Sequence, residues 1–319
     1  MFFQKERNAG GGSGKTFKIL MTIDSRYKGI FFMLLAALGF SVMGGAAKAL
    51  KGSFSAGQLV FYRNAVGLVF LLPGLFIRPP VQEGGKPLRL AFRGLMGTLA
   101  LYTLLYCILH IPLGTAMSYN LTSALFIAVF SFFLFKEYHG QKVLLAVLLG
   151  FAGMLLIYKP VMHLPWYYHM AGLISGITSA IAYLTVHRLA KYYDPRIIVL
   201  SFLLIGFLVP LITMIIHYAT GIQTDGLFIV DFRLPYGIEW CWILLMGLAA
   251  LFGQYFVTKA YGADKAGIVS VFGYANIIYS VFIGMLLGDA FPDWMSWAGI
   301  SCIIASGVLI SLVKRKSAA

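Results

Sequence analysis

The stretch LMGTLALY, residues 95–102, returns 150 positions later as LMGLAALF, residues 245–252. Later landmarks keep the same order, because GMLLI at 153–157 is followed by GVLI at 307–310 at nearly the same offset. The sequence therefore predicts two related halves, each about half of the chain.

The repeat lies in a very apolar chain. Of its 319 residues, 60% are hydrophobic and 11% are charged, whereas soluble domains carry about 25% charged residues. This composition indicates a membrane protein, and no segment has the pattern of a cleaved signal peptide. The cysteines Cys107, Cys241 and Cys302 have no C-x-x-C spacing, so we expect neither disulfides nor a metal site.

Ten apolar runs have the length of about 20 residues that a helix needs to cross the hydrocarbon core. The predicted spans are 28–50, 56–77, 89–110, 115–135, 140–158, 167–188, 196–218, 237–259, 266–287 and 294–313. We expect an all-α polytopic membrane protein with two five-helix repeats, at 28–160 and 166–315, and cytoplasmic tails at 1–27 and 316–319.

Charge placement gives the orientation, because Lys and Arg accumulate on the cytoplasmic side. With the N-terminus inside, 20 Lys and Arg residues lie at cytoplasmic ends and 4 at outer ends, with Arg63 left over. Both termini are therefore predicted in the cytoplasm, and the net charge of +14 needs no nucleic acid partner. An odd number of spans in each half makes the repeats inverted, a build typical of secondary transporters with alternating access.

Four short motifs carry a family resemblance: FYRN at 61–64, IPLGTA at 111–116, FKE at 135–137 and GFAG at 150–153. With them, residues 28–315 resemble the EamA branch of the drug/metabolite transporter superfamily. The resemblance implies ten helices in two inverted repeats of five. It also implies transport of a small metabolite such as an amino acid, nucleoside, sugar or vitamin across the cytoplasmic (inner) membrane.

The string AGGGSGKT, residues 9–16, nearly matches the phosphate-binding pattern G-x-x-x-x-G-K-[ST]. A working phosphate loop joins a strand to a helix, and residues 1–9 offer no buried strand. We interpret the string as a disordered tail, either native or left by an expression tag, and we expect no cofactor.

All eleven acidic residues lie at predicted helix ends, in loops or in the tail. Proton-driven carriers commonly place Asp, Glu or His within the membrane, so we predict a facilitator or exchanger. Enzymes need paired carboxylates or a nucleophile with its base, and no such cluster is present. A membrane enzyme, such as a lipid or acyl group transferase, stays the alternative function, and a scaffold or sensor without flux is a third.

Arg63 is the basic residue farthest inside a predicted span, about 9 Å deep at 1.5 Å per residue. It has two interpretations: snorkelling to the outer headgroups, or binding an anionic group of the substrate. Lys48 and Arg93 lie nearer to span ends, and for both we expect snorkelling.

Polar side chains on other spans complete the predicted site. Ser175, Ser179, Tyr183 and His187 recur every four residues, so they share one helix face that is expected to point inward. The alternative is packing against a neighbouring helix. The predicted substrate-binding residues are Arg63, Tyr102, Tyr106, Asn120, Ser123, Ser179, Tyr183, Gln254, Tyr255, Tyr274, Asn276 and Tyr279. They predict a small organic substrate with an anionic group, carried by a protein for which a monomer is sufficient.

Overall fold

The computed structural model describes residues 27–111, 113–124, 126–127, 130, 141–158, 165–222, 230–264, 266–287 and 294–316. Its helices are α2 (Lys28–Ala49), α3 (Ala56–Ile77), α4 (Pro87–His110), α5 (Leu113–Leu121), α7 (Gln141–Tyr158), α8 (Trp166–Leu189), α9 (Pro195–Thr220), α10 (Glu239–Ala263), α11 (Ala266–Phe272), α12 (Ala275–Leu286) and α13 (Trp294–Lys316). These residues contain helices and connections but no strand.

The described helices confirm a multi-pass membrane protein. Across these ranges, seven helical segments are long and apolar enough to span a bilayer, and α3 has the predicted bounds. The predicted span 266–287 is interrupted, because it consists of α11 and α12. The end of the predicted span 115–135 and the glycine-rich string near the N-terminus lie outside the described residues.

Local chemistry explains where helices begin and end. At the start of α3, Ser55 Oγ accepts a bond from the Gln58 backbone N–H, and Gln58 Oε1 accepts one from the Ser55 N–H. This capping box satisfies two backbone donors. α9 begins with Pro195 and is capped after Thr220 by Gly221, whose φ of 67° lies in the left-handed region that favours glycine.

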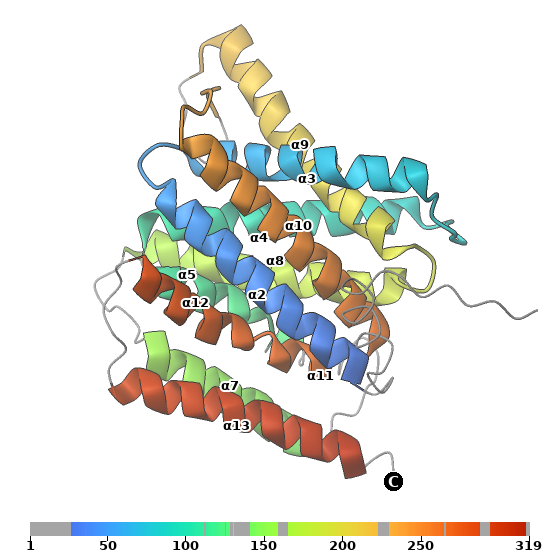
Figure 1. Ribbon diagram of the computed structural model, residues 1–319, viewed down its shortest axis with the longest axis vertical. Helices are drawn as coiled ribbons and strands as arrows, with labels where there is room; N and C mark the ends of the chain where they lie inside the picture. The colour runs from blue at the N-terminus through green and yellow to red at the C-terminus, as the bar shows by residue number, and fades with distance from the viewer. Residues whose placement is uncertain are drawn as a thin grey trace, which may run out of the picture.

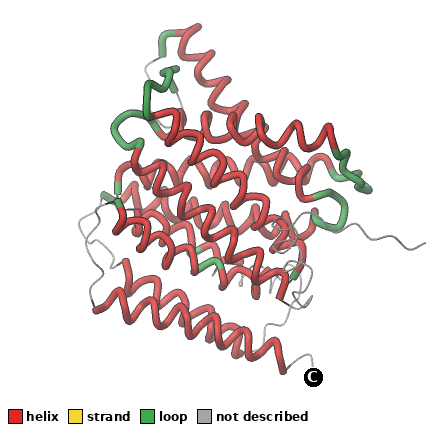
Figure 2. The backbone as a smooth tube through the Cα atoms, viewed as in Figure 1, coloured by secondary structure: helices red, strands yellow, loops and turns green. Residues whose placement is uncertain are grey.

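The helices lie side by side, with connections gathered mainly at the two ends of the bundle (Figures 1 and 2). α2 packs along α10, α4 packs along α8, and α3 packs against α9. α7 and α13 form a pair at one edge of the bundle (Figure 1). The central helices are thus arranged around one interior, and the α7–α13 pair lies to one side of it.

Two helices end in tight turns within the bundle. After α5, the Thr122 N–H donates to the Tyr119 carbonyl at 3.2 Å. Between α11 and α12, the N–H groups of Gly273 and Tyr274 donate to the carbonyls of Ser270 and Val271 at 3.0 and 3.1 Å. Bonds that reach back three residues instead of four are those of a 3₁₀ turn, which inside a helix often marks a hinge.

The crossing of α2 and α10 depends on glycine. A Cβ atom added at Gly39 would lie 2.8 Å from the backbone nitrogen of Gly253 and 2.9 Å from the carbonyl oxygen of Ala249. Small residues allow two membrane helices to approach backbone to backbone, and dispersion then holds them together. The absence of a side chain at Gly39 therefore sets the distance between these two helices.

We predict that Gly39→Ala lowers the thermal stability of the purified protein, because the new methyl group meets backbone atoms that cannot rotate away. Overpacking of this kind costs about 1–3 kcal/mol. The matched control is Gly74→Ala, at an exposed helical glycine whose added Cβ would have no neighbour within 4 Å. A thermal-unfolding midpoint that falls equally in both variants would contradict this account of the crossing.

Candidate functional site

A cavity of about 90 Å³ lies among the central helices, lined by residues from α2, α3, α4, α5, α8, α9 and α10 and from the α11–α12 segment. A water molecule needs about 10–15 Å³ of such space, so the cavity has room for several waters or for part of a small molecule. Much of its wall is apolar, including Phe40, Met43, Leu101 and Phe202.

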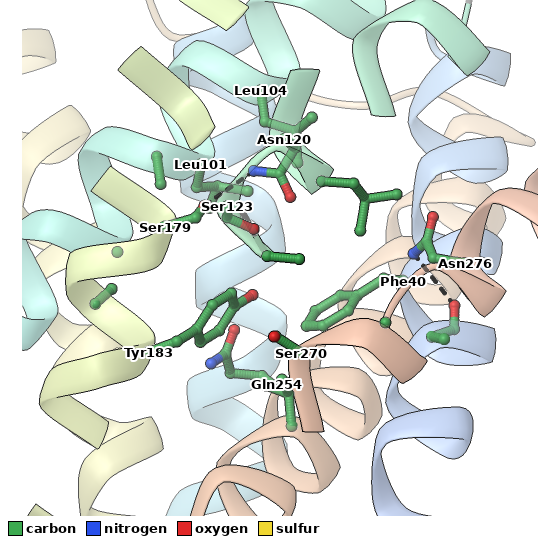
Figure 3. A pocket seen from close by; sticks show the side chains of 18 of the residues that line it. Phe40, Leu101, Leu104, Asn120, Ser123, Ser179, Tyr183, Gln254, Ser270 and Asn276 are labelled. Atoms are coloured by element: carbon green, nitrogen blue, oxygen red, sulfur yellow. Dashed lines mark hydrogen bonds between the residues drawn. The ribbon is translucent and has the colours of Figure 1, made fainter. Parts of the chain in front are cut away.

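Polar groups lie on opposite walls of this cavity (Figure 3). On one side, Asn120 Nδ2 donates to the hydroxyl oxygens of Ser175 and Ser179 at 2.8 and 2.9 Å. On the other side, Tyr183, Gln254 and Ser270 lie together, with Phe40 nearby (Figure 3).

Asn276 lines the cavity next to the break between α11 and α12. Its Nδ2 donates to the Ala37 carbonyl at 3.3 Å, and its main-chain carbonyl accepts a bond from Ser41 Oγ. The residue therefore joins α12 to α2 while it borders the cavity.

Arg63 of α3 points into the bundle and not toward the headgroups. Its side chain is 2% exposed, and its guanidinium carbon lies 5.0 Å from the centroid of the Phe202 ring. Nη1 donates to Asn64 Oδ1 at 2.9 Å, and Nε lies 3.4 Å from Met43 Sδ. Arg63 is thus held by an amide, a thioether and an aromatic face while it lines the cavity.

Arg93 of α4 contradicts the expectation that it snorkels. Its side chain is 1% exposed, lines the cavity, and places its guanidinium carbon 4.8 Å from the same Phe202 ring. The reason is Gly97, one helical turn later: a Cβ there would lie 2.6 Å from Arg93 Nη1 and 2.8 Å from the Phe202 ring. This glycine leaves the space in which the guanidinium lies.

Position along a predicted span indicates how deep a residue lies but not which way it faces, so sequence reasoning missed Arg93 as a cavity residue. The available signal was the spacing Arg93-x-x-x-Gly97. Residues four apart share one helix face, and a glycine there leaves room for a long side chain to fold along the helix.

The cavity is electrostatically positive. Of the described residues that line it, none is an Asp or Glu, whereas two are arginines. Buried polar nitrogens without a hydrogen-bond partner in the described part of the chain include Arg93 Nε, Arg93 Nη1 and Gln254 Nε2. All three belong to cavity-lining residues and are donors, so the site is suited to a group that accepts hydrogen bonds.

The cavity contains seven of the twelve predicted site residues: Arg63, Asn120, Ser123, Ser179, Tyr183, Gln254 and Asn276. The described lining does not include the other five, which are Tyr102, Tyr106, Tyr255, Tyr274 and Tyr279.

Several of these tyrosines have other neighbours. Tyr106 contacts the rings of His110 and Tyr168, with centroids 4.4 and 5.7 Å away. The Lys259 ammonium lies 4.6 Å from the Tyr255 ring. Tyr274 is fully buried in the cluster shared with α7 and α13.

The polar face of α8 points inward, as expected. Ser179 and Tyr183 line the cavity, Ser175 Oγ donates to the Ala100 carbonyl at 3.1 Å, and His187 Nδ1 lies 2.7 Å from the Tyr261 carbonyl. The stripe thus combines the two alternatives, because part of it borders the cavity and part joins neighbouring helices. Across the described ranges, no group of three or more His, Cys, Asp and Glu residues could hold a metal ion.

Comparisons with known proteins agree with this architecture. A solved crystal structure superposes with a TM-score of 0.66 at 17% identity, covering 92% of this chain and 98% of that one. This likeness concerns the fold alone.

Sequence relatives extend over nearly the whole chain. An uncharacterized transporter from Helicobacter pylori is 32% identical over 89% of this chain and 94% of its own length. The pseudopaline exporter CntI of Pseudomonas aeruginosa is 29% identical over 92% of this chain and 100% of its own length. The pattern of the EamA-like transporter family matches residues 27–159. The chain therefore belongs to the EamA-like transporter family, a branch of the drug/metabolite transporter superfamily.

Proposed function

We propose that this protein is a secondary transporter that carries a small organic anion across the cytoplasmic membrane by alternating access. The observation that carries the proposal is the cavity among the helices, whose described lining has two guanidiniums and no carboxylate. Ionisable groups inside a membrane bundle commonly mark a substrate pathway. A relative named as a pseudopaline exporter supports a dissolved small molecule as the cargo.

Packing between α3 and α9 supports two repeats related by a pseudo-two-fold axis. Gly67 faces Leu203, and Gly206 faces Asn64. Both glycines are eleven residues after the first residue of their helix, and both partners are eight residues after it. The glycine of each helix therefore contacts the residue at the same position in the other helix. Such reciprocal contacts are expected of a two-fold axis.

Contacts of α2 and α8 support the same relation. Ser41 and Ser179 are each thirteen residues after the first residue of their helix. Ser41 Oγ donates to the main-chain carbonyl of Asn276 at 2.9 Å, and Ser179 Oγ accepts from the side-chain Nδ2 of Asn120 at 2.9 Å. Asn120 lies near the end of α5 and Asn276 near the start of α12, beside the two turns within the bundle. The two serines, at equivalent helix positions, therefore each join one proposed half to the other. Rocking of such halves about a central site is the usual form of alternating access.

The proposed orientation predicts opposite exposure of Lys51 and Arg78, which lie beyond the two ends of α3 and are both exposed. In a protein whose three cysteines have been replaced, we expect Lys51→Cys to react with a membrane-impermeant maleimide added outside intact cells. Arg78→Cys should react only after the cells are opened. The reverse pattern would place the N-terminus outside and exclude the proposed topology.

We predict that Arg63→Gln lowers transport of the anionic substrate by about 10- to 100-fold, since a hydrogen bond to a charged group contributes about 1.5–3 kcal/mol. The measurement is counterflow of labelled amino acids, organic acids and phosphorylated cofactors in proteoliposomes. Lys51→Gln is the control, because it removes one positive charge from an exposed turn outside the cavity. Unchanged uptake by the Arg63 variant would remove this residue from the site.

We predict that Gly273→Ala slows the conformational step, because the added Cβ would lie 2.9 Å from the Ser270 carbonyl at the turn between α11 and α12. The maximal counterflow rate should fall severalfold while KM changes less than about threefold, since hinge strain acts on the movement and the added methyl group removes none of the polar groups that line the cavity. Gly74→Ala is the matched control. A changed KM at a normal maximal rate would argue against a hinge at this turn.

A further inference from the structure

We propose that the substrate carries at least two negative charges, as two carboxylates or a phosphate monoester, and that Arg93 binds the second of them. This inference rests on the proposed function and narrows its substrate class. It starts from the geometry of the two arginines around one aromatic ring.

Both guanidiniums lie against Phe202. Their central carbons are 5.0 and 4.8 Å from the same ring centroid, so the two cations are less than about 10 Å apart. One small molecule in the cavity is therefore within reach of both cations.

The two arginines differ in what already holds them. Arg63 has hydrogen-bond partners in Asn64 and Met43. Arg93 is 1% exposed, and its Nε and Nη1 atoms have no partner in the described part of the protein. A buried guanidinium with unpaired donors is unfavourable unless water or a ligand completes its bonding. Arg93 therefore offers more open donors than Arg63 to a group that enters the cavity.

A single negative charge does not satisfy this arrangement. A monoanion leaves one net positive charge in the cavity, because two arginines and no carboxylate are among the described lining residues. A dianion neutralises both, and guanidiniums pair with carboxylate or phosphate oxygens through two parallel hydrogen bonds. Gln254 Nε2, also unpartnered and on the cavity wall, supplies a further donor.

The Phe202 ring does not replace an anion. Cation–π contact stabilises the positive charge through the ring face, but it leaves in-plane N–H donors of Arg93 without acceptors. A purely structural arginine in this fold has a different environment: Arg196 donates to Asp194 and to the carbonyls of Gly74 and Arg78. The Nε and Nη1 atoms of Arg93 have no such carboxylate or carbonyl acceptors in the described part of the protein, which points to a binding role.

The experiment measures ligand-induced thermal shifts of the purified protein with charge-matched probes. The probes are dicarboxylates of four to eight carbons and phenyl phosphate, each compared with its monoanion, the half-amide or the methyl ester. We expect at least one dianion to bind at least tenfold more tightly than its monoanion. In Arg93→Gln this preference should fall below about threefold.

Two further variants separate binding from folding. Gly97→Ala keeps Arg93 but displaces its guanidinium, so the dianion preference should again be lost. Arg89→Gln is the control, because Arg89 lies one turn earlier on α4 and is exposed, and this variant should keep the preference.

Without ligand, Arg93→Gln should unfold at a higher temperature than the unaltered protein, because it removes an unpaired buried charge. A structural role for Arg93 would lower that temperature instead.

The outcomes distinguish the two proposals. If no probe shows a dianion preference, or if Arg93→Gln retains it, the assignment of Arg93 is wrong. Counterflow of monoanions that depends on Arg63 would then still support the proposed function. If no anion is exchanged in proteoliposomes, the proposed function fails, and the present inference fails with it.

Discussion

The central constraint on this structure is the burial of two guanidiniums against one phenylalanine ring inside a membrane bundle. Two positive charges less than about 10 Å apart repel by at least about 1.7 kcal/mol at an effective dielectric constant of 20. Burial of each charge adds a desolvation cost. The fold provides an aromatic face and, for Arg63, the Asn64 amide, but no carboxylate among the described lining residues. The arrangement is therefore costly without an anion, and the proposed anionic substrate would lower that cost.

Glycines make this arrangement possible, because both arginine sites depend on the absence of a side chain nearby. Gly97 leaves space for the Arg93 guanidinium and for the edge of the Phe202 ring. Gly206 of α9 leaves space for Asn64, whose Oδ1 accepts the bond from Arg63 and whose Nδ2 donates to the Val60 carbonyl. The small residues that let membrane helices approach closely thus also position the charged groups.

Hydropathy predicted the helices well, but the facing of individual side chains was harder to predict. The bounds of α3 follow from an apolar run between a capping box and the Arg78-Pro79-Pro80 break, since both signals are local. Arg63 was recognised because it is a charge deep in such a run. Arg93 was missed because its direction depends on Gly97 and on the Phe202 ring of another helix.

The tyrosines show where extrapolation along a helix fails. Tyr274 and Asn276 are two residues apart at the turn between α11 and α12, where the regular helical period is interrupted. Asn276 borders the cavity, whereas Tyr274 packs over Gly150 of α7. No single helical wheel describes both sides of such a turn, so the directions of the Tyr274 and Asn276 side chains had to come from the three-dimensional structure.

The proposed repeats place different chemistry at corresponding helix positions. Arg63 and Phe202 are each seven residues after the first residue of α3 and α9, so one half supplies a cation where the other supplies the ring beneath it. Arg93 belongs to the same half as Arg63. If the halves rock against each other, the two charges move together as one unit while the ring moves with the opposite half. An anion bound to both guanidiniums would then stay with the first half through the transport cycle. The position of Phe202 relative to the anion would change between the two conformations, so this contact would make their affinities for the anion differ.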